Sequence, residues 1–99
     1  MNRLDKAEEN FNEALALRQS IGEKDGIFTS YIELSKLYNS KNKTSEAIVY
    51  AELGLGIAKE TGFPVNLSEA SEQLSTLYKA QGKFQRALEM LQFHIEISN

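Results

Sequence analysis

The sequence predicts an all-α fold: a superhelix of antiparallel helical hairpins with five helices, or about two and a half repeats. Three observations support this prediction. The chain matches itself at a shift of 40 residues, apolar side chains recur every three or four positions, and glycines or short polar runs separate the apolar stretches. Apolar residues at this spacing form one face of a helix, and a long fixed period is typical of stacked helical repeats. We therefore expect residues 1–99 to form a single domain.

The internal repeat is visible at comparable positions of successive copies. The identical matches are Ala7, Ala47 and Ala87; Leu34 and Leu74; Ser35 and Ser75; Leu37 and Leu77; Tyr38 and Tyr78; and Gly22 and Gly62. Chance would produce two or three such matches, but not the entire register.

The first predicted helix is Leu4–Ser20, whose apolar residues include Ala7 and Phe11 and form one stripe. The break Gly22–Gly26 follows, and its first glycine suits a left-handed helix end. We predict the next helix over Phe28–Ser40, where large apolar residues again recur at spacings of three and four.

The third predicted helix, Thr44–Thr61, is the repeat of the first. Gly54 in its interior costs about 1 kcal/mol relative to alanine, so close packing of a partner helix is its expected reason. After the break Gly62–Asn66 come Leu67–Gln81 and Phe84–Ser98, the repeats of the second and third helices. Residues 1–21 would then be the second helix of a partial repeat, and 25–62 and 65–98 two further repeats.

These residues resemble a known family. The pattern Tyr31-x2-Leu34-Ser35-x2-Tyr38-x8-Ala47-x3-Ala51-x2-Gly54 is similar to the tetratricopeptide repeat (TPR) signature, and a second copy follows at residues 71–94. The period of 40 exceeds the standard length of about 34, so the resemblance implies longer helices, as in elongated TPRs of bacterial regulatory and sensor proteins. Tryptophan at the first position and the terminal proline of the family pattern are missing.

Composition limits the possible functions. Eleven basic and 14 acidic residues give a net charge of −3, which argues against nucleic-acid binding because no basic stripe is present to neutralise phosphates. No window approaches 18 consecutive apolar residues, so we expect no membrane span. The chain contains no cysteine, which permits a reducing compartment, and we expect a cytoplasmic protein.

Residues for catalysis are scarce. His94 is the only histidine, and a general base also needs an orienting partner and a substrate site. Zinc sites need several nitrogen or sulfur ligands, which one histidine without cysteine does not provide. Gly54-x-Gly56 lies within a predicted helix instead of following a strand, so it is not a dinucleotide motif. We expect no enzyme activity, no metal and no cofactor.

The resemblance implies a binding surface on the first helix of each hairpin, which lines the concave side of such stacks. The outward-facing positions implied by the family register are Thr29, Ile32, Lys36, Asn39, Glu69, Glu72, Thr76 and Lys79. The clamp that holds chaperone carboxylates in some TPR domains is not expected, because Glu33 and Glu69 occupy its positions and would repel an anion. A partner with positive charge fits better, although these positions could also be the solvated face of a spacer.

We interpret the chain as a protein-protein interaction scaffold, the repeat region of a larger regulatory or signalling protein. A complete small protein is the alternative to such a piece, and a peptide-sensing module whose curvature changes on binding is the alternative function. The partner would be a protein or peptide. Apolar residues of the terminal helices also predict self-association as a homo-oligomer; these residues are Leu4, Phe11, Leu15, Leu88, Leu91 and Ile95.

Overall fold

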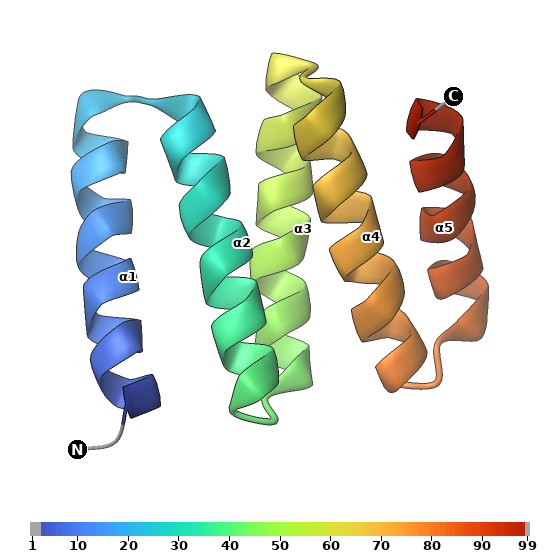
Figure 1. Cartoon of the computed structure of the whole chain (residues 1–99), viewed down its shortest axis with the longest axis horizontal. Coiled ribbons are helices and arrows are strands. Elements are labelled where there is room, and N and C mark those ends of the chain that lie inside the picture. The colour runs from blue at the N-terminus through green and yellow to red at the C-terminus, as the bar shows by residue number, and fades with distance from the viewer. Residues whose placement is uncertain (1–2, 99) are drawn as a thin grey trace.

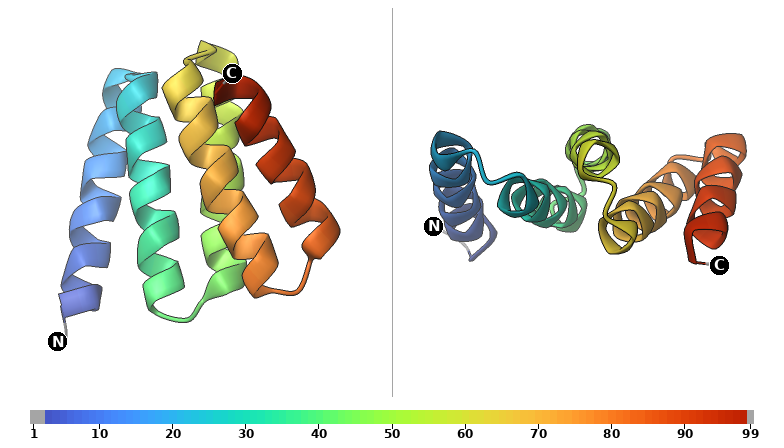
Figure 2. Two further views of the ribbon diagram at one scale, coloured as in Figure 1. Left: turned by 45° about the vertical axis from the view of Figure 1, so that its right-hand side comes forward. Right: turned by 90° about the horizontal axis from the view of Figure 1, so that it is seen from above.

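The computed structural model describes residues 3–98, which form five α-helices and no strand (Figure 1). The helices are α1 (Arg3–Ile21), α2 (Lys24–Ser40), α3 (Thr44–Thr61), α4 (Pro64–Ala80) and α5 (Phe84–Ser98). Each helix packs against the next in the chain, and α2 also contacts α4. Seen from above, they follow one another in chain order, with α1 and α5 at the two ends of the row (Figure 2). The predicted all-α repeat fold is confirmed.

Glycine ends two of the helices in the predicted manner. Gly22 after α1 has φ +68°, and Gly62 after α3 has φ +72°. This left-handed conformation is costly for residues with a Cβ atom. It lets the Gly62 N–H donate to the carbonyl oxygen of Ala58 at 2.8 Å, which satisfies a group that the helix would otherwise leave unpaired.

The helices α2 and α4 begin about one turn earlier than predicted. α2 begins at Lys24 and not at Phe28, and α4 begins at Pro64 and not at Leu67. Proline is well suited to the first helical position, because its φ is already helical and its missing N–H would have no partner there. The predicted breaks were therefore too long, and α4 gains a first turn that contains Pro64 and Val65.

The core lies where the helices of each hairpin and of successive hairpins meet. Alanines keep the backbones close, and leucines, isoleucines and aromatics fill the remaining space. Its buried residues are Phe28, Ile32, Leu34, Leu37, Ala47, Ile48, Ala51, Leu55, Ala58, Ala70, Leu74, Leu77, Tyr78 and Ala87.

One hydrogen bond recurs inside both hairpins and fixes their register. The Ser35 hydroxyl of α2 donates to the carbonyl oxygen of Ala47 in α3 at 2.7 Å. The Ser75 hydroxyl of α4 donates to the carbonyl oxygen of Ala87 in α5 at 3.1 Å. The sequence repeat is therefore also a repeat of contacts.

A second contact recurs between successive repeats. Lys41 after α2 donates to Asp5 Oδ1 of α1 at 3.4 Å, and Gln81 after α4 donates to Ser45 Oγ of α3 at 3.0 Å. Both members of the second pair lie one repeat further along the chain than those of the first. The docking of α2 on α1 is thus repeated by the docking of α4 on α3.

Glu8 holds α1 against α2 through two short hydrogen bonds. Lys41 Nζ donates to Glu8 Oε1 at 2.6 Å, and the Tyr38 hydroxyl donates to Glu8 Oε2 at 2.7 Å. These donors, Lys41 first and Tyr38 second, lower the pKa of the Glu8 carboxyl below its ordinary value. The same bonds raise the pKa of Lys41 and that of Tyr38.

We expect Glu8→Gln to destabilise the chain at neutral pH but not in acid. The Glu8 pKa is lower in the folded than in the unfolded chain, so its stabilisation is complete above the unfolded value, about 4.5, and is lost as the pH falls through the folded value. Thermal unfolding followed by circular dichroism should show a melting temperature below wild type at pH 7, and this difference should shrink towards pH 3. Glu13→Gln on an exposed side chain of α1 is the control. A difference that stays constant from pH 7 to pH 3 would contradict the role of the carboxylate.

Candidate binding groove

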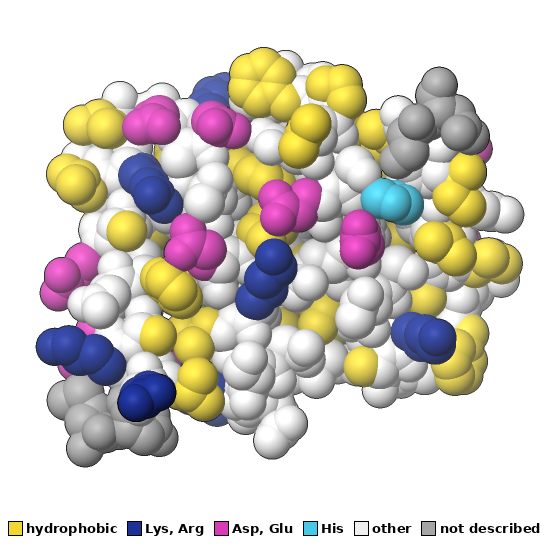
Figure 3. All heavy atoms as spheres, in the orientation of Figure 1, with side chains coloured by type: hydrophobic (Ala, Val, Ile, Leu, Met, Phe, Trp, Pro, Cys, Tyr) yellow, Lys and Arg dark blue, Asp and Glu magenta, His cyan; other side chains and the backbone are white. Residues whose placement is uncertain are grey.

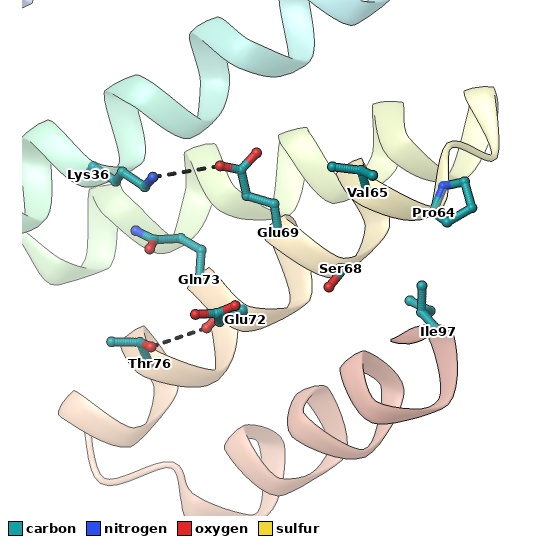
Figure 4. Close-up of a pocket in the computed structure, with 9 residues that line it drawn as sticks. All are labelled: Lys36, Pro64, Val65, Ser68, Glu69, Glu72, Gln73, Thr76 and Ile97. Atoms are coloured by element: carbon teal, nitrogen blue, oxygen red, sulfur yellow. Dashed lines mark hydrogen bonds and ion pairs between the residues drawn. The ribbon is translucent and has the colours of Figure 1, made fainter. Parts of the chain in front are cut away.

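An open groove of about 650 Å³ lies between α2, α4 and α5 (Figure 4). This volume lies within the range of roughly 300–1,000 Å³ that is common for ligand sites. Most of its lining comes from α4, with one residue each from α2 and α5. The lining residues are Lys36, Pro64, Val65, Ser68, Glu69, Glu72, Gln73, Thr76 and Ile97.

The amphipathic pattern of α4 places these residues on one face. Val65, Ser68, Glu69, Glu72 and Thr76 follow one another at spacings of three, one, three and four, which puts them on one side of a helix. The opposite side is buried in the core, where its residues include Ala70, Leu74 and Leu77. The groove face is therefore free to carry polar groups without a cost to packing.

More acidic than basic side chains line the groove. Lys36 Nζ of α2 lies 3.7 Å from Glu69 Oε2 of α4, an ion pair that spans the groove wall (Figure 4). Both side chains are largely exposed, so the pair contributes under about 1 kcal/mol and can open for a ligand. The Glu72 side chain is 70% exposed. Figure 3 shows acidic and basic side chains between hydrophobic ones on the face over α2 and α4.

The third wall is α5, which is hydrogen-bonded to α4 beside the groove. His94 Nδ1 lies 2.8 Å from the Ser68 hydroxyl and 3.1 Å from the Ser68 carbonyl oxygen. His94 Nε2 lies 3.9 Å from Glu72 Oε2. Ile97, further along α5, adds an apolar side chain to the lining.

These contacts link α4 and α5 on one side of the groove. Ser68 lies in the second turn of α4, and its hydroxyl and its carbonyl oxygen both lie within hydrogen-bond distance of the His94 ring. The contacts of His94 therefore fix the position of α5 against α4.

A hydrogen-bond relay anchors the middle of the groove. Gln73 Nε2 of α4 donates to the Ser35 hydroxyl of α2 at 3.1 Å, and that hydroxyl donates in turn to the Ala47 carbonyl of α3. Ser35 is fully buried. The relay joins three helices, so the floor of the groove is set by buried contacts while its charged rim remains exposed.

The structure brings together half of the positions predicted from the sequence. Lys36, Glu69, Glu72 and Thr76 all line the groove. The remaining polar positions are exposed but lie outside the lining; these are Thr29, Asn39 and Lys79.

The prediction that Ile32 faces outward was wrong. Ile32 is only 3% exposed, and its Cδ1 lies 3.1 Å from where a Cβ atom at Gly54 would stand. The side chain occupies the space that the missing Gly54 side chain leaves, so it belongs to the core of the hairpin. It therefore adds no apolar contact to the groove.

Five lining residues were not predicted from the sequence; these are Pro64, Val65, Ser68, Gln73 and Ile97. Pro64 and Val65 fell in the predicted break. If α4 is predicted to begin at Pro64, helical spacing places Val65 and Ser68 on the same face as Glu69. Ile97 lies on a second helix, and nothing in its sequence neighbourhood indicates that it reaches this face.

No group of three or more histidine, aspartate or glutamate side chains in residues 3–98 is placed to hold a metal ion. No helix in the same range has the length and apolar character needed to cross a membrane.

Comparison with known proteins gives one match. The family model described as tetratricopeptide repeat matches residues 1–60. This segment contains α1, α2 and nearly all of α3, and it includes Lys36 of the groove. No curated protein and no solved structure matches the chain significantly.

Proposed function

Since the chain belongs to the tetratricopeptide repeat family, we propose that it is a protein-interaction scaffold whose groove between α2, α4 and α5 holds a segment of a partner protein. Modules of this family are in general non-catalytic and bind other proteins. The observation that carries the proposal is the groove itself, which combines a charged rim with apolar side chains at one end.

The chemistry of the groove favours a partner segment that carries a basic residue next to an apolar one. Glu72 is exposed, and Glu69 forms only an exposed ion pair with Lys36, so a lysine or arginine of the partner can replace Lys36 at little cost. Val65 is 77% exposed, and with Pro64 and Ile97 it offers an apolar contact at the other end. An extended or helical peptide could use both ends at once.

A displayed random peptide library, selected on the purified chain, tests this proposal. We expect enriched peptides to carry lysine or arginine within a few positions of an apolar residue. In calorimetric titrations of one such peptide, Glu72→Lys should weaken binding at least about tenfold, since attraction becomes repulsion. Glu46→Lys, which reverses an exposed charge on α3, is the matched control and should leave the affinity nearly unchanged. Enriched peptides without basic residues, or equal affinity for the Glu72→Lys variant, would contradict the proposed partner chemistry.

One observation favours peptide sensing as a second candidate function. Residues of α2, α4 and α5 line the same groove, so a bound segment would contact successive repeats and bias the angle between them. The chain has no cysteine, which allows single labels to be placed on α2 and α5. A distance between the labels that changes when the selected peptide binds would support sensing. An unchanged distance would contradict sensing and support the scaffold function.

Other parts of the sequence interpretation stay predictions. These are the origin in a larger regulatory or signalling protein, the cytoplasmic location and the lack of nucleic-acid partners.

A further inference from the structure

A second pocket, of about 290 Å³, lies between side chains of α3 and α5. Its volume is just below the range of roughly 300–1,000 Å³ that is common for small-molecule sites, so it can take a single side chain. Met90 and Phe93 supply apolar walls, and Lys59, Glu89 and Glu96 supply charged ones. Among the described residues, none lines both this pocket and the groove, so the pocket is a separate site.

One repeat earlier, a tyrosine ring occupies the equivalent place. The ring centroid of Tyr31 in α2 lies 6.2 Å from that of Tyr50 in α3, and Gln19 Nε2 of α1 donates to the Tyr31 hydroxyl at 3.4 Å. The ring therefore lies between side chains of α1 and α3. A shift of 40 residues leads from Gln19 and Tyr50 to Lys59 and Met90, and both of these line the pocket.

The helix α4 does not supply the corresponding ring. Ser71 stands at the position of Tyr31, and its hydroxyl lies 2.8 Å and 3.0 Å from the carbonyl oxygens of Leu67 and Ser68. The hydroxyl is thus hydrogen-bonded within its own helix, and Ser71 is fully buried beneath the surface. We therefore attribute the pocket to a serine that replaces a tyrosine of the preceding repeat.

The face that bears the pocket stays accessible where further helices follow. Val49 and Leu53 of α3 stand at the positions of Glu89 and Phe93, and they are 54% and 45% exposed although α4 packs on α3. The stacking of helices therefore leaves this face open, and the pocket is not a docking surface for the next helix of a stack. The self-association expected from the apolar residues of the terminal helices concerns other side chains and stays a prediction.

The walls of the pocket offer the contacts that a tyrosine side chain uses. Met90 and Phe93 are partly buried against the core, and a thioether and a ring both pack well against a second ring. Lys59 Nζ lies 5.9 Å from the centroid of the Phe93 ring. Because Lys59 stands at the position of Gln19, its ammonium group can donate to a phenol hydroxyl in the pocket as Gln19 donates to Tyr31.

We propose that this pocket binds a tyrosine side chain of a partner protein, from a segment that carries lysine or arginine next to the tyrosine. The preference for basic neighbours follows from Glu89 and Glu96, which are both exposed and outnumber Lys59. They stand four residues before and three residues after Phe93, so they flank the ring on one side of α5. A basic residue on either side of the bound tyrosine would meet one of these carboxylates.

The tripeptide Lys-Tyr-Lys with blocked ends is the probe, and the methionine methyl groups are the reporters. The chain has two methionines, Met1 and Met90, so isotope labelling of these methyl groups gives two NMR signals. Titration of the full chain should shift the Met90 signal saturably, because the tyrosine ring lies against it, and leave the Met1 signal unchanged. Leucine in place of the tyrosine should weaken binding at least about fivefold, since the aromatic contacts are lost.

Two variants of the chain test the pocket itself. Glu96→Lys should weaken binding of the tripeptide at least about fivefold, because attraction becomes repulsion, whereas Glu46→Lys on α3 is the matched control and should bind like wild type. Ser71→Tyr supplies the ring from within the chain and should abolish the peptide-induced shift, with circular dichroism to show that the fold is retained.

Three results would overturn the proposal. The first is the lack of a saturable Met90 shift at millimolar peptide, and the second is equal affinity for the leucine peptide. The third is binding that Glu72→Lys weakens and Glu96→Lys does not, since the peptide would then lie in the groove. If Ser71→Tyr does not fold, Glu96→Lys and the leucine peptide still decide the outcome.

Discussion

Phe28→Ala is expected to lower the free energy of unfolding by about 3–5 kcal/mol, the usual cost of removing a large buried aromatic side chain. Phe28 is 1% exposed and is among the largest fully buried side chains of α2. Its loss removes apolar contacts and leaves a cavity that the closely packed alanines around the hairpin cannot fill. The total free energy of unfolding of such domains is about 5–15 kcal/mol, so the expected loss is a large fraction of the total.

Urea unfolding of wild type and Phe28→Ala measures this loss. Phe84→Ala is the matched control, because Phe84 is 66% exposed and its truncation should change stability by no more than about 0.5 kcal/mol. Equal midpoints for the two variants would show that Phe28 does not contribute to the core as described.

Gly54→Phe should destabilise the hairpin of α2 and α3 by about 1–3 kcal/mol or more, through overpacking. A Cβ atom at Gly54 would lie 3.1 Å from Ile32 Cδ1 and 3.6 Å from Tyr31 Cβ, so a ring beyond it meets occupied space. Better helix propensity offsets only a few tenths of a kcal/mol of this cost.

Gly56→Ala, two residues further along the same helix, is the control for Gly54→Phe. No atom lies within 4 Å of a Cβ atom at Gly56, so alanine should stabilise the chain by up to about 1 kcal/mol. Thermal unfolding of both variants measures the difference. A Gly54→Phe variant that is as stable as wild type would show that the packing of Ile32 does not require the absence of a side chain at position 54.

The repeat in the sequence was sufficient to predict the five helices, their pairing and the left-handed ends at Gly22 and Gly62. These features follow from local chemistry: apolar spacing decides helix or strand, and glycine tolerates positive φ. The starts of α2 and α4 did not follow, because Gly26 and Pro64 were interpreted as parts of the breaks, whereas each lies in the first turn of a helix. Pro64 was the available signal, since proline at that position begins a helix more readily than it ends one.

The groove was harder to predict than the fold. Lys36, Glu69, Glu72 and Thr76 were predicted from the register of the family resemblance, and all four line the groove. Ile32 was misplaced because a family register gives positions along a helix but not the space around them. In this chain Gly54 leaves space in which the Ile32 side chain packs. This close approach depends on how α2 and α3 pack together, so the sequence does not show it.

Within residues 3–98, most contacts join helices that follow one another in the chain, and α1 does not contact α5. Among the described residues, α1 has no buried side chain and depends on α2 alone. Fluctuations that detach α1 therefore require less free energy than those that open the central hairpins. Backbone amides of α1 should exchange with solvent first, while α2, α4 and α5 stay folded and keep the groove intact.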